Sequence, residues 1–129
     1  MSWIYKQSTG EMFHPDASLL TVGYSGHEAG KNNPDMQNVH NTGPIPEGTY
    51  SIALIVDGEG HAVDYEHKKA PVMHLLPDEG NEMFGRSGFL IHGDSISAPG
   101  TASQGCIILP HEAREQIAAS ADKQLVVIA

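Results

Sequence analysis

Short apolar runs separated by glycine and proline limit what this chain can fold into. Each run has the length of a strand, and the residues between the runs favour turns, so the pattern indicates a β-rich fold. The 14 glycines and 8 prolines supply these turns. Because neither a repeat nor a linker divides the 129 residues, we expect one domain that spans residues 1–129.

The strands expected from these runs begin with a hairpin that turns at residues 8–10, with Trp3 and Tyr5 on one face. Further strands are expected at 18–25, 49–56, 72–76, 87–92, 106–109 and 124–129. One helix is expected from Pro110 onward, because proline suits a first helical turn. Residues 26–41 are polar and without a usable period, which predicts a long loop.

The net charge of −9 argues against nucleic acid and anionic membranes as partners. No apolar stretch is long enough to span a bilayer, so no membrane insertion is expected. The opening residues lack the basic region and apolar core of a Sec signal, which predicts synthesis in the cytoplasm and export, if any, by another machine. The single cysteine, Cys106, forms no intramolecular disulfide and is therefore free for packing or chemistry.

Cys106 and His92 are the best candidates for chemistry, because each lies at the end of an apolar run beside a glycine. A thiol needs a base or a positive field to become a nucleophile, and His92 is the natural base. If the two are coupled, alkylation of Cys106 should stay fast below the free-thiol pKa of about 8.5. The carbonyls of Gly93 and Asp94, or the Asp94 carboxylate, are candidates to hold the second ring nitrogen of His92.

The loop before the cysteine supplies the other elements of such a site. Gly105 permits close approach of the backbone to a substrate, and the amides of Gln104, Gly105 and Cys106 are candidates for an oxyanion hole. Ser103 is a candidate hydroxyl donor or a brace for the loop. The product would be a thioester on Cys106 that passes to water or to an amine.

Other uses of these residues are open at this stage. Free cysteines are among the most buried residues, and a histidine at a strand end is often structural. A zinc site is the competing use of histidines, but the spacings between His61, His67 and His74 match no common pair of zinc ligands. We therefore expect neither a metal nor a cofactor.

Three ordered motifs resemble a known family. The run HGDSISAPGTASQGCIIL, which ends at Leu109, is similar to the active-site motif of the L,D-transpeptidases, and GPIPEGTY (43–50) resembles an element of an earlier strand in those enzymes. Together with the segments Tyr24–Gly26 and Gly30–Pro34, the layout resembles the type VI secretion L,D-transpeptidase effectors, which are toxins that target peptidoglycan. The resemblance covers about residues 3–109 and implies a mainly β fold, a β-sandwich of mixed sheets with one short helix after the cysteine.

The resemblance also implies roles for individual residues. Cys106 matches the nucleophile and His92 its base, and the flanking catalytic motif is matched by Gly93, Ser103 and Gly105. The residues that we expect to bind substrate are Arg86, Asp94 and Gln104. Arg86 would receive a substrate carboxylate in a bidentate pair or form an ordinary ion pair. The wider family has a histidine two residues before the cysteine and an arginine two after it, where this chain has Gln104 and Ile108. These departures favour stem trimming or exchange over cross-linking.

The implied substrate is the tetrapeptide stem of peptidoglycan, cut between meso-diaminopimelate and D-alanine. The enzyme would act as an L,D-carboxypeptidase or exchange D-amino acids, as an antibacterial toxin in the periplasm of Gram-negative target cells. Its partners would be the stem peptides, the type VI secretion machinery and a cognate immunity protein. Papain-like hydrolases place the cysteine before the histidine and fit this order poorly. The alternative is a peptidoglycan-binding module of the same fold with weakened catalysis.

Overall fold

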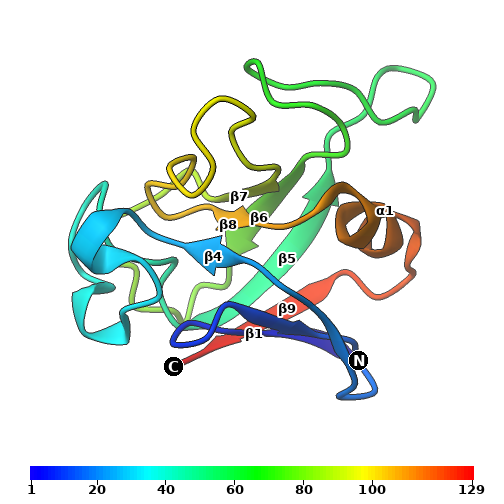
Figure 1. Ribbon diagram of the computed structural model, residues 1–129. Helices are drawn as coiled ribbons and strands as arrows, with labels where there is room; N and C mark the ends of the chain where they lie inside the picture. The colour runs from blue at the N-terminus through cyan, green and yellow to red at the C-terminus, as the bar shows by residue number, and fades with distance from the viewer.

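One nine-stranded mixed sheet that curves round on itself forms the body of the protein in the computed structural model, which describes residues 1–129 (Figure 1). The strands are β1 (Ser2–Lys6), β2 (Glu11–Phe13), β3 (Leu19–Val22), β4 (Tyr24–Ser25), β5 (Gly48–Leu54), β6 (Met73–Pro77), β7 (Leu90–His92), β8 (Ile107–Ile108) and β9 (Gln124–Ile128). Their order across the sheet is β3-β2-β1-β9-β5-β6-β7-β8-β4. Each predicted run contains a strand, and the mainly β class is confirmed.

Gly23 explains why the sheet has a barrel-like shape. The strands at its two edges, β3 and β4, are consecutive in the chain and are separated by Gly23 alone. A side chain at Gly23 would overlap the carbonyl oxygen of Ile108, and one at Gly10 would overlap the carbonyl oxygen of Gly23. The predicted strand at 18–25 is therefore one extended segment that serves both edges, and the sheet is one bent layer instead of two separate ones.

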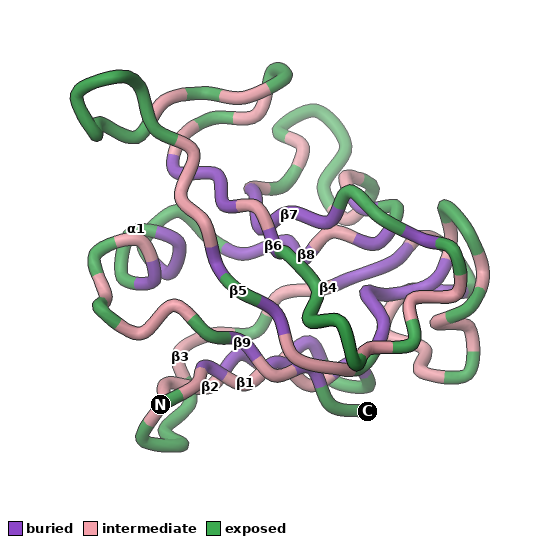
Figure 2. The backbone as a smooth tube through the Cα atoms, turned by 180° about the vertical axis from the view of Figure 1, so that it is seen from behind, coloured by how far each residue is buried: buried purple, intermediate pink, exposed green.

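The apolar core lies inside this bend. The opening hairpin pairs β1 with β2, and Trp3 and Tyr5 are both buried, which confirms the predicted face. The helix α1 (His111–Ala119) begins after Pro110 and adds Ala113 and Ile117 to a cluster of 16 buried side chains. Most of the buried apolar side chains lie on the strands, and residues 56–64 and 94–101 are largely exposed, whereas the connection 26–47 is partly buried (Figure 2). None of the helices has the length and hydropathy needed to cross a bilayer.

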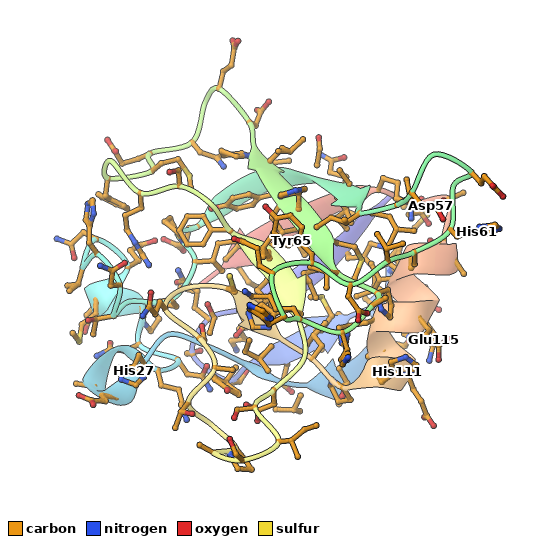
Figure 3. All side chains as sticks on the ribbon, turned by 90° about the horizontal axis from the view of Figure 1, so that it is seen from above. His27, Asp57, His61, Tyr65, His111 and Glu115 are labelled. Atoms are coloured by element: carbon orange, nitrogen blue, oxygen red, sulfur yellow. The ribbon has the colours of Figure 1, made fainter.

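Two long connections extend from the sheet and flank its β7–β8 end. The predicted loop at 26–41 contains two short 3-10 helices, η1 (Glu28–Gly30) and η2 (Pro34–Met36). Residues 56–70, which we call the arm, form a projecting loop between β5 and β6 (Figure 1). Bridges between Val56 and Ala62 and between Tyr65 and Lys68 order the arm, and the Tyr65 ring packs edge-on against His74. Figure 3 shows Tyr65 lying over the strands.

Candidate functional site

The predicted pair lies at two neighbouring parallel strands. His92 is the last residue of β7, and Cys106 immediately precedes β8. The register pairs His92 with Ile108, and Cys106 lies two residues before Ile108. Cys106 is therefore level with Leu90, whose backbone amide lowers the thiol pKa, while His92 lies two residues further along β7. The two strands are parallel neighbours, and such a pair needs a long crossover, which here is the 93–106 loop.

His92 is held in the form that a general base requires. The side chain is 97 % buried, since only 3 % of its surface is exposed. Its Nδ1 lies 2.8 Å from the carbonyl oxygen of Gly93, which only accepts, so Nδ1 carries the proton and Nε2 carries the lone pair. Burial lowers the pKa of His92, and the charges of Lys68 and Arg114 lower it further, against the raising effect of the Gly93 carbonyl. The ring is thus neutral near pH 7.

The Nε2 atom of His92 is buried and has no hydrogen-bond partner. Buried polar atoms are nearly always paired, and the exceptions are often functional. From the sequence, either Gly93 or Asp94 was a candidate to hold the other ring nitrogen of His92. In the structure, Nδ1 is held by the carbonyl of Gly93. Nε2 is consequently the ring atom available to take a proton.

Cys106 is a protonated thiol in the resting protein. Burial raises its pKa, although the backbone amide of Leu90 and the charge of Lys68 act in the opposite direction. No hydrogen bond joins its sulfur to His92. The pair is therefore neutral at rest, and the predicted fast alkylation below the free-thiol pKa does not fit this geometry.

Ser103 braces the loop that carries the cysteine. Its Oγ donates a hydrogen bond to the carbonyl oxygen of Cys106 at 2.6 Å. The same Oγ accepts hydrogen bonds from the amide of Gly26 at 2.8 Å and from the amide of Gly105 at 3.0 Å. Of the two roles expected for this hydroxyl, the structure shows the brace. Ser25 adds a second tie, because its Oγ donates to the carbonyl oxygen of Gly105 at 2.8 Å.

The predicted oxyanion amides divide into two groups. The amide of Gly105 is already bonded to Ser103, whereas those of Gln104 and Cys106 donate to no protein acceptor. Gly105 has a φ of +137°, and a Cβ there would lie 2.7 Å from the Phe89 ring. Glycine is thus required at 105 by backbone conformation and packing. The amides of Gln104 and Cys106 are the donors left for an oxyanion.

Arg86 is a buried link between two loops, with 6 % of its surface exposed. Its Nη1 donates to the carbonyls of Gln37 (2.6 Å) and Pro44 (2.7 Å), and its Nη2 donates to those of Gly43 (2.9 Å) and Gln104 (3.2 Å). Each terminal nitrogen has two hydrogens, so all four are used. The terminal donors that a bidentate pair with a substrate carboxylate needs are therefore occupied by backbone carbonyls. Arg86 forms no ion pair with a carboxylate of the protein either. Its expected contact with substrate stays a prediction.

Asp94 and Gln104, also assigned to substrate binding, have different surroundings. The Asp94 carboxylate accepts from Tyr24 Oη at 2.6 Å and from the amides of Ser95 and Gly100. Desolvation is the largest single influence and raises the pKa of Asp94, but these hydrogen bonds and the charge of Lys31 together keep that pKa below its usual range. Gln104 is exposed and borders a hollow of about 190 Å³ with Arg86. Neither assignment is tested by this geometry.

The motifs of the first half of the chain converge on the same loop. Tyr24 also accepts the amide of Ala102 at 3.0 Å. Lys31 lies 4.5 Å from the Tyr24 ring centroid and donates to the carbonyl of Gly100 at 2.6 Å. Residues that are distant in sequence thus act together to position residues 94–106.

Arg114 and Lys68 border the site but were not among the predicted residues. A cleft of about 590 Å³ lies beside His92, and its walls are the end of the arm (67–69), the loop 92–97, Ala102 and Arg114. Arg114 follows Ala113 and precedes Ile117 on the core-facing side of α1, which is a signal that sequence inspection could have used. Lys68 lies in an irregular arm and has no comparable signal.

The histidines considered for zinc do not gather. No group of three or more His, Cys, Asp or Glu side chains is arranged to hold a metal ion. On the exposed arm, Nδ1 of His61 lies 3.5 Å from Oδ2 of Asp57. On α1, Nδ1 of His111 lies 3.2 Å from Oε1 of Glu115. His27 is on the opposite side of the molecule from both (Figure 3).

Comparison with known proteins agrees with this architecture. The chain superimposes on a crystal structure of a Cys-to-Ser mutant of Enterococcus faecium L,D-transpeptidase with a TM-score of 0.53 and 16 % identity, over 98 % of this chain. It spans 49 % of that protein's length, and at this identity the match establishes the fold alone. No curated protein matches the sequence. The Tlde1 domain model matches residues 20–128. The chain therefore belongs to the Tlde1 domain family, the type VI L,D-transpeptidase effector family.

Proposed function

We propose that the protein is a cysteine-dependent L,D-carboxypeptidase that also exchanges D-amino acids by L,D-transpeptidation on peptidoglycan tetrapeptide stems. Membership of the family supports a peptidoglycan-modifying, L,D-transpeptidase-like effector. The observation that carries the finer proposal is His92, whose buried Nε2 has no partner and lies on the strand next to Cys106. An unpaired nitrogen there is costly to the fold, and a role in proton transfer explains it.

The reaction begins with attack of Cys106 Sγ on the carbonyl carbon of meso-diaminopimelate while His92 Nε2 takes the thiol proton. The amides of Gln104 and Cys106 stabilise the oxyanion. The bond to D-alanine breaks when His92 returns the proton to the leaving amine, which leaves a thioester on Cys106. Water, deprotonated by His92, then releases the tripeptide, or the amine of a D-amino acid forms a new amide.

The departures from the wider family favour trimming and exchange. Ile108 is buried in the core, so no guanidinium reaches the site from that position. Gln104, which replaces the second histidine, is exposed and offers no additional base. The site thus has one base, His92, for both half-reactions.

Release of D-alanine tests the proposal. Purified tetrapeptide stems are incubated with the unmodified protein and with Cys106→Ala, and free D-alanine and tripeptide are measured by mass spectrometry. We expect release by the unmodified protein and none by Cys106→Ala, because no other residue supplies a thiol. Adding a labelled D-amino acid separates exchange from hydrolysis. No release by the unmodified protein would exclude the enzyme and favour the peptidoglycan-binding module.

The biological part of the proposal is an antibacterial effector that is delivered by a type VI secretion machine, acts in the target periplasm and is neutralised by an immunity protein. Family membership supports this assignment. Expression with a periplasmic signal should harm Gram-negative cells, whereas cytoplasmic expression should not, because the substrate lies outside the cytoplasm. Equal harm in both compartments would point to another substrate.

A further inference from the structure

The cleft beside His92 is positively charged in a protein of net charge −9. Lys68, Lys69 and Arg114 border it, and Asp94 is the carboxylate among its walls. Asp94 is already bonded to Tyr24 and to two amides of its own loop, and Lys69 pairs with Asp64 at 3.4 Å. Neither Lys68 nor Arg114 forms an ion pair, so two cations face the cleft without a counter-ion from the protein.

Arg114 combines burial with a free donor. It is 5 % exposed. Nε donates to the carbonyl of Leu109 at 3.1 Å, and Nη1 donates to those of Lys69 and Pro71 at 3.0 and 2.9 Å. Nη2 has no hydrogen-bond partner, and it is not among the unpaired atoms that are sealed from solvent. The two hydrogens of Nη2 therefore remain for a ligand in the cleft.

The free nitrogen lies next to the residue that follows the base. A Cβ on Gly93 would come within 2.7 Å of Arg114 Nη2, so only glycine lets the guanidinium approach the backbone here. His92 protonates the leaving amine in the proposed reaction. In a C-terminal amino acid, the carboxylate is attached to the carbon that bears this amine, so it must lie close to His92. Arg114 occupies that neighbourhood.

We propose that Arg114, assisted by Lys68, binds the C-terminal carboxylate of the residue that leaves during the reaction. This inference rests on the proposed function and adds a selectivity to it: the site accepts peptides that end in a free carboxylate one residue beyond the attacked carbonyl. Arginine suits the role because its planar nitrogens match a carboxylate. The fixed Nε and Nη1 contacts hold the fork in place before a ligand arrives.

A pair of peptides tests the carboxylate contact without disturbing the fold. The tetrapeptide stem with a free C-terminus and the same stem with a C-terminal carboxamide are titrated into Cys106→Ala by calorimetry. We expect the free acid to bind about tenfold or more tightly, which is the scale of a hydrogen bond to a charged group. Equal affinity for the two peptides, or binding of neither, would overturn the proposal.

Variants locate the contact. Adding Lys68→Gln to Cys106→Ala should reduce the preference for the free acid several-fold and leave the affinity for the amide unchanged. Lys69→Gln is the matched control, because its charge is already paired, and it should retain the full preference. Arg114→Lys should reduce the preference most, and a thermal unfolding curve reveals whether it still folds. A preference that survives both Lys68→Gln and a folded Arg114→Lys would place the carboxylate elsewhere.

Turnover separates this inference from the proposed function. If the unmodified protein releases D-alanine from the free acid and D-alaninamide from the carboxamide at equal rates, the enzyme assignment stands and the carboxylate site is excluded. If neither peptide is cut while the binding preference is present and falls with Lys68→Gln, the carboxylate site stands and the enzyme assignment fails.

Discussion

Two buried arginines, Arg86 beside the cysteine loop and Arg114 beside the histidine loop, differ in how their donors are used. Both are almost fully enclosed. Arg86 gives all four hydrogens of its terminal nitrogens to backbone carbonyls, whereas Arg114 keeps Nη2 free at the edge of the cleft. The terminal nitrogens of the arginine on the cysteine side are thus fully used, and those of the arginine on the histidine side are not.

The difference separates positioning from recognition. A guanidinium whose four terminal hydrogens are all used holds the backbone and has no pair of parallel donors left for a carboxylate. An unpaired nitrogen beside a solvent-filled cleft costs the fold little and is available for a charged group. The unsatisfied Nε2 of His92 lies on the same side as Arg114. Of the two arginines, Arg114 is therefore the one that can bind a carboxylate, and Arg86 is the one that supports the loops.

Arg86→Met should give the largest loss of stability. It removes the donors to four carbonyl oxygens of two loops, and we expect the free energy of unfolding to fall by about 3–5 kcal/mol. Urea denaturation followed by circular dichroism measures this. A loss under about 1 kcal/mol together with loss of stem binding would instead restore the sequence-based role of Arg86 as a substrate ligand.

Ser103→Ala should give the next largest effect. It leaves the amides of Gly26 and Gly105 without an acceptor, which should cost about 1–3 kcal/mol of stability and loosen the loop before Cys106. Denaturation and D-alanine release are both measured. Ser51→Ala, an exposed serine on β5 that is remote from the cleft, is the control and should change neither. Equal behaviour of the two variants would show that Ser103 is not a brace.

The strands, and the placement of His92 and Cys106 at two strands, were predictable from sequence because apolar runs and glycines have local meanings. The closure of the sheet was not, because it depends on Gly23 lying against Ile108, a contact between residues far apart in the chain. The roles of the arginines could not be read locally either. Arg86 looks like a surface cation next to Gly85, and its carbonyl partners come from residues 37–44 and 104.

The direction of the thiol pKa was also beyond the sequence. His92 next to a cysteine suggests a lowered pKa, but that expectation assumes an exposed pair in hydrogen-bond contact. Here burial dominates and raises the pKa of Cys106. Burial depends on how the whole sheet packs, so no local motif reports it.

Tyr24→Phe tests the tie at the far end of the 94–106 loop and should have a smaller effect. The phenol loses its hydrogen bonds to Asp94 and to the amide of Ala102, which should cost about 0.5–1.5 kcal/mol each at most. Thermal unfolding measures the loss. Tyr65→Phe is the matched control, because the hydroxyl of Tyr65 forms no hydrogen bond with the protein, and its curve should match that of the unmodified protein. Two identical shifts would exclude a specific tie at Tyr24.

The smallest predicted effect is a pH shift that separates Lys68 from Lys69. Burial depresses the pKa of His92, and the charges of Lys68 and Arg114 depress it further. The ring therefore stays neutral, and kcat/KM stays high, down to a pH below 6.5, the ordinary pKa of histidine. Activity should fall only as the pH drops through this lowered pKa. Lys68→Gln removes one positive charge, so the pKa of His92 rises and the acid limb moves to higher pH. The rates of each variant are compared with the plateau of the same variant, so a change in carboxylate affinity that does not depend on pH cancels. Lys69→Gln should leave the limb in place. An acid limb that is unmoved by Lys68→Gln would mean that the cleft charge does not act on the base.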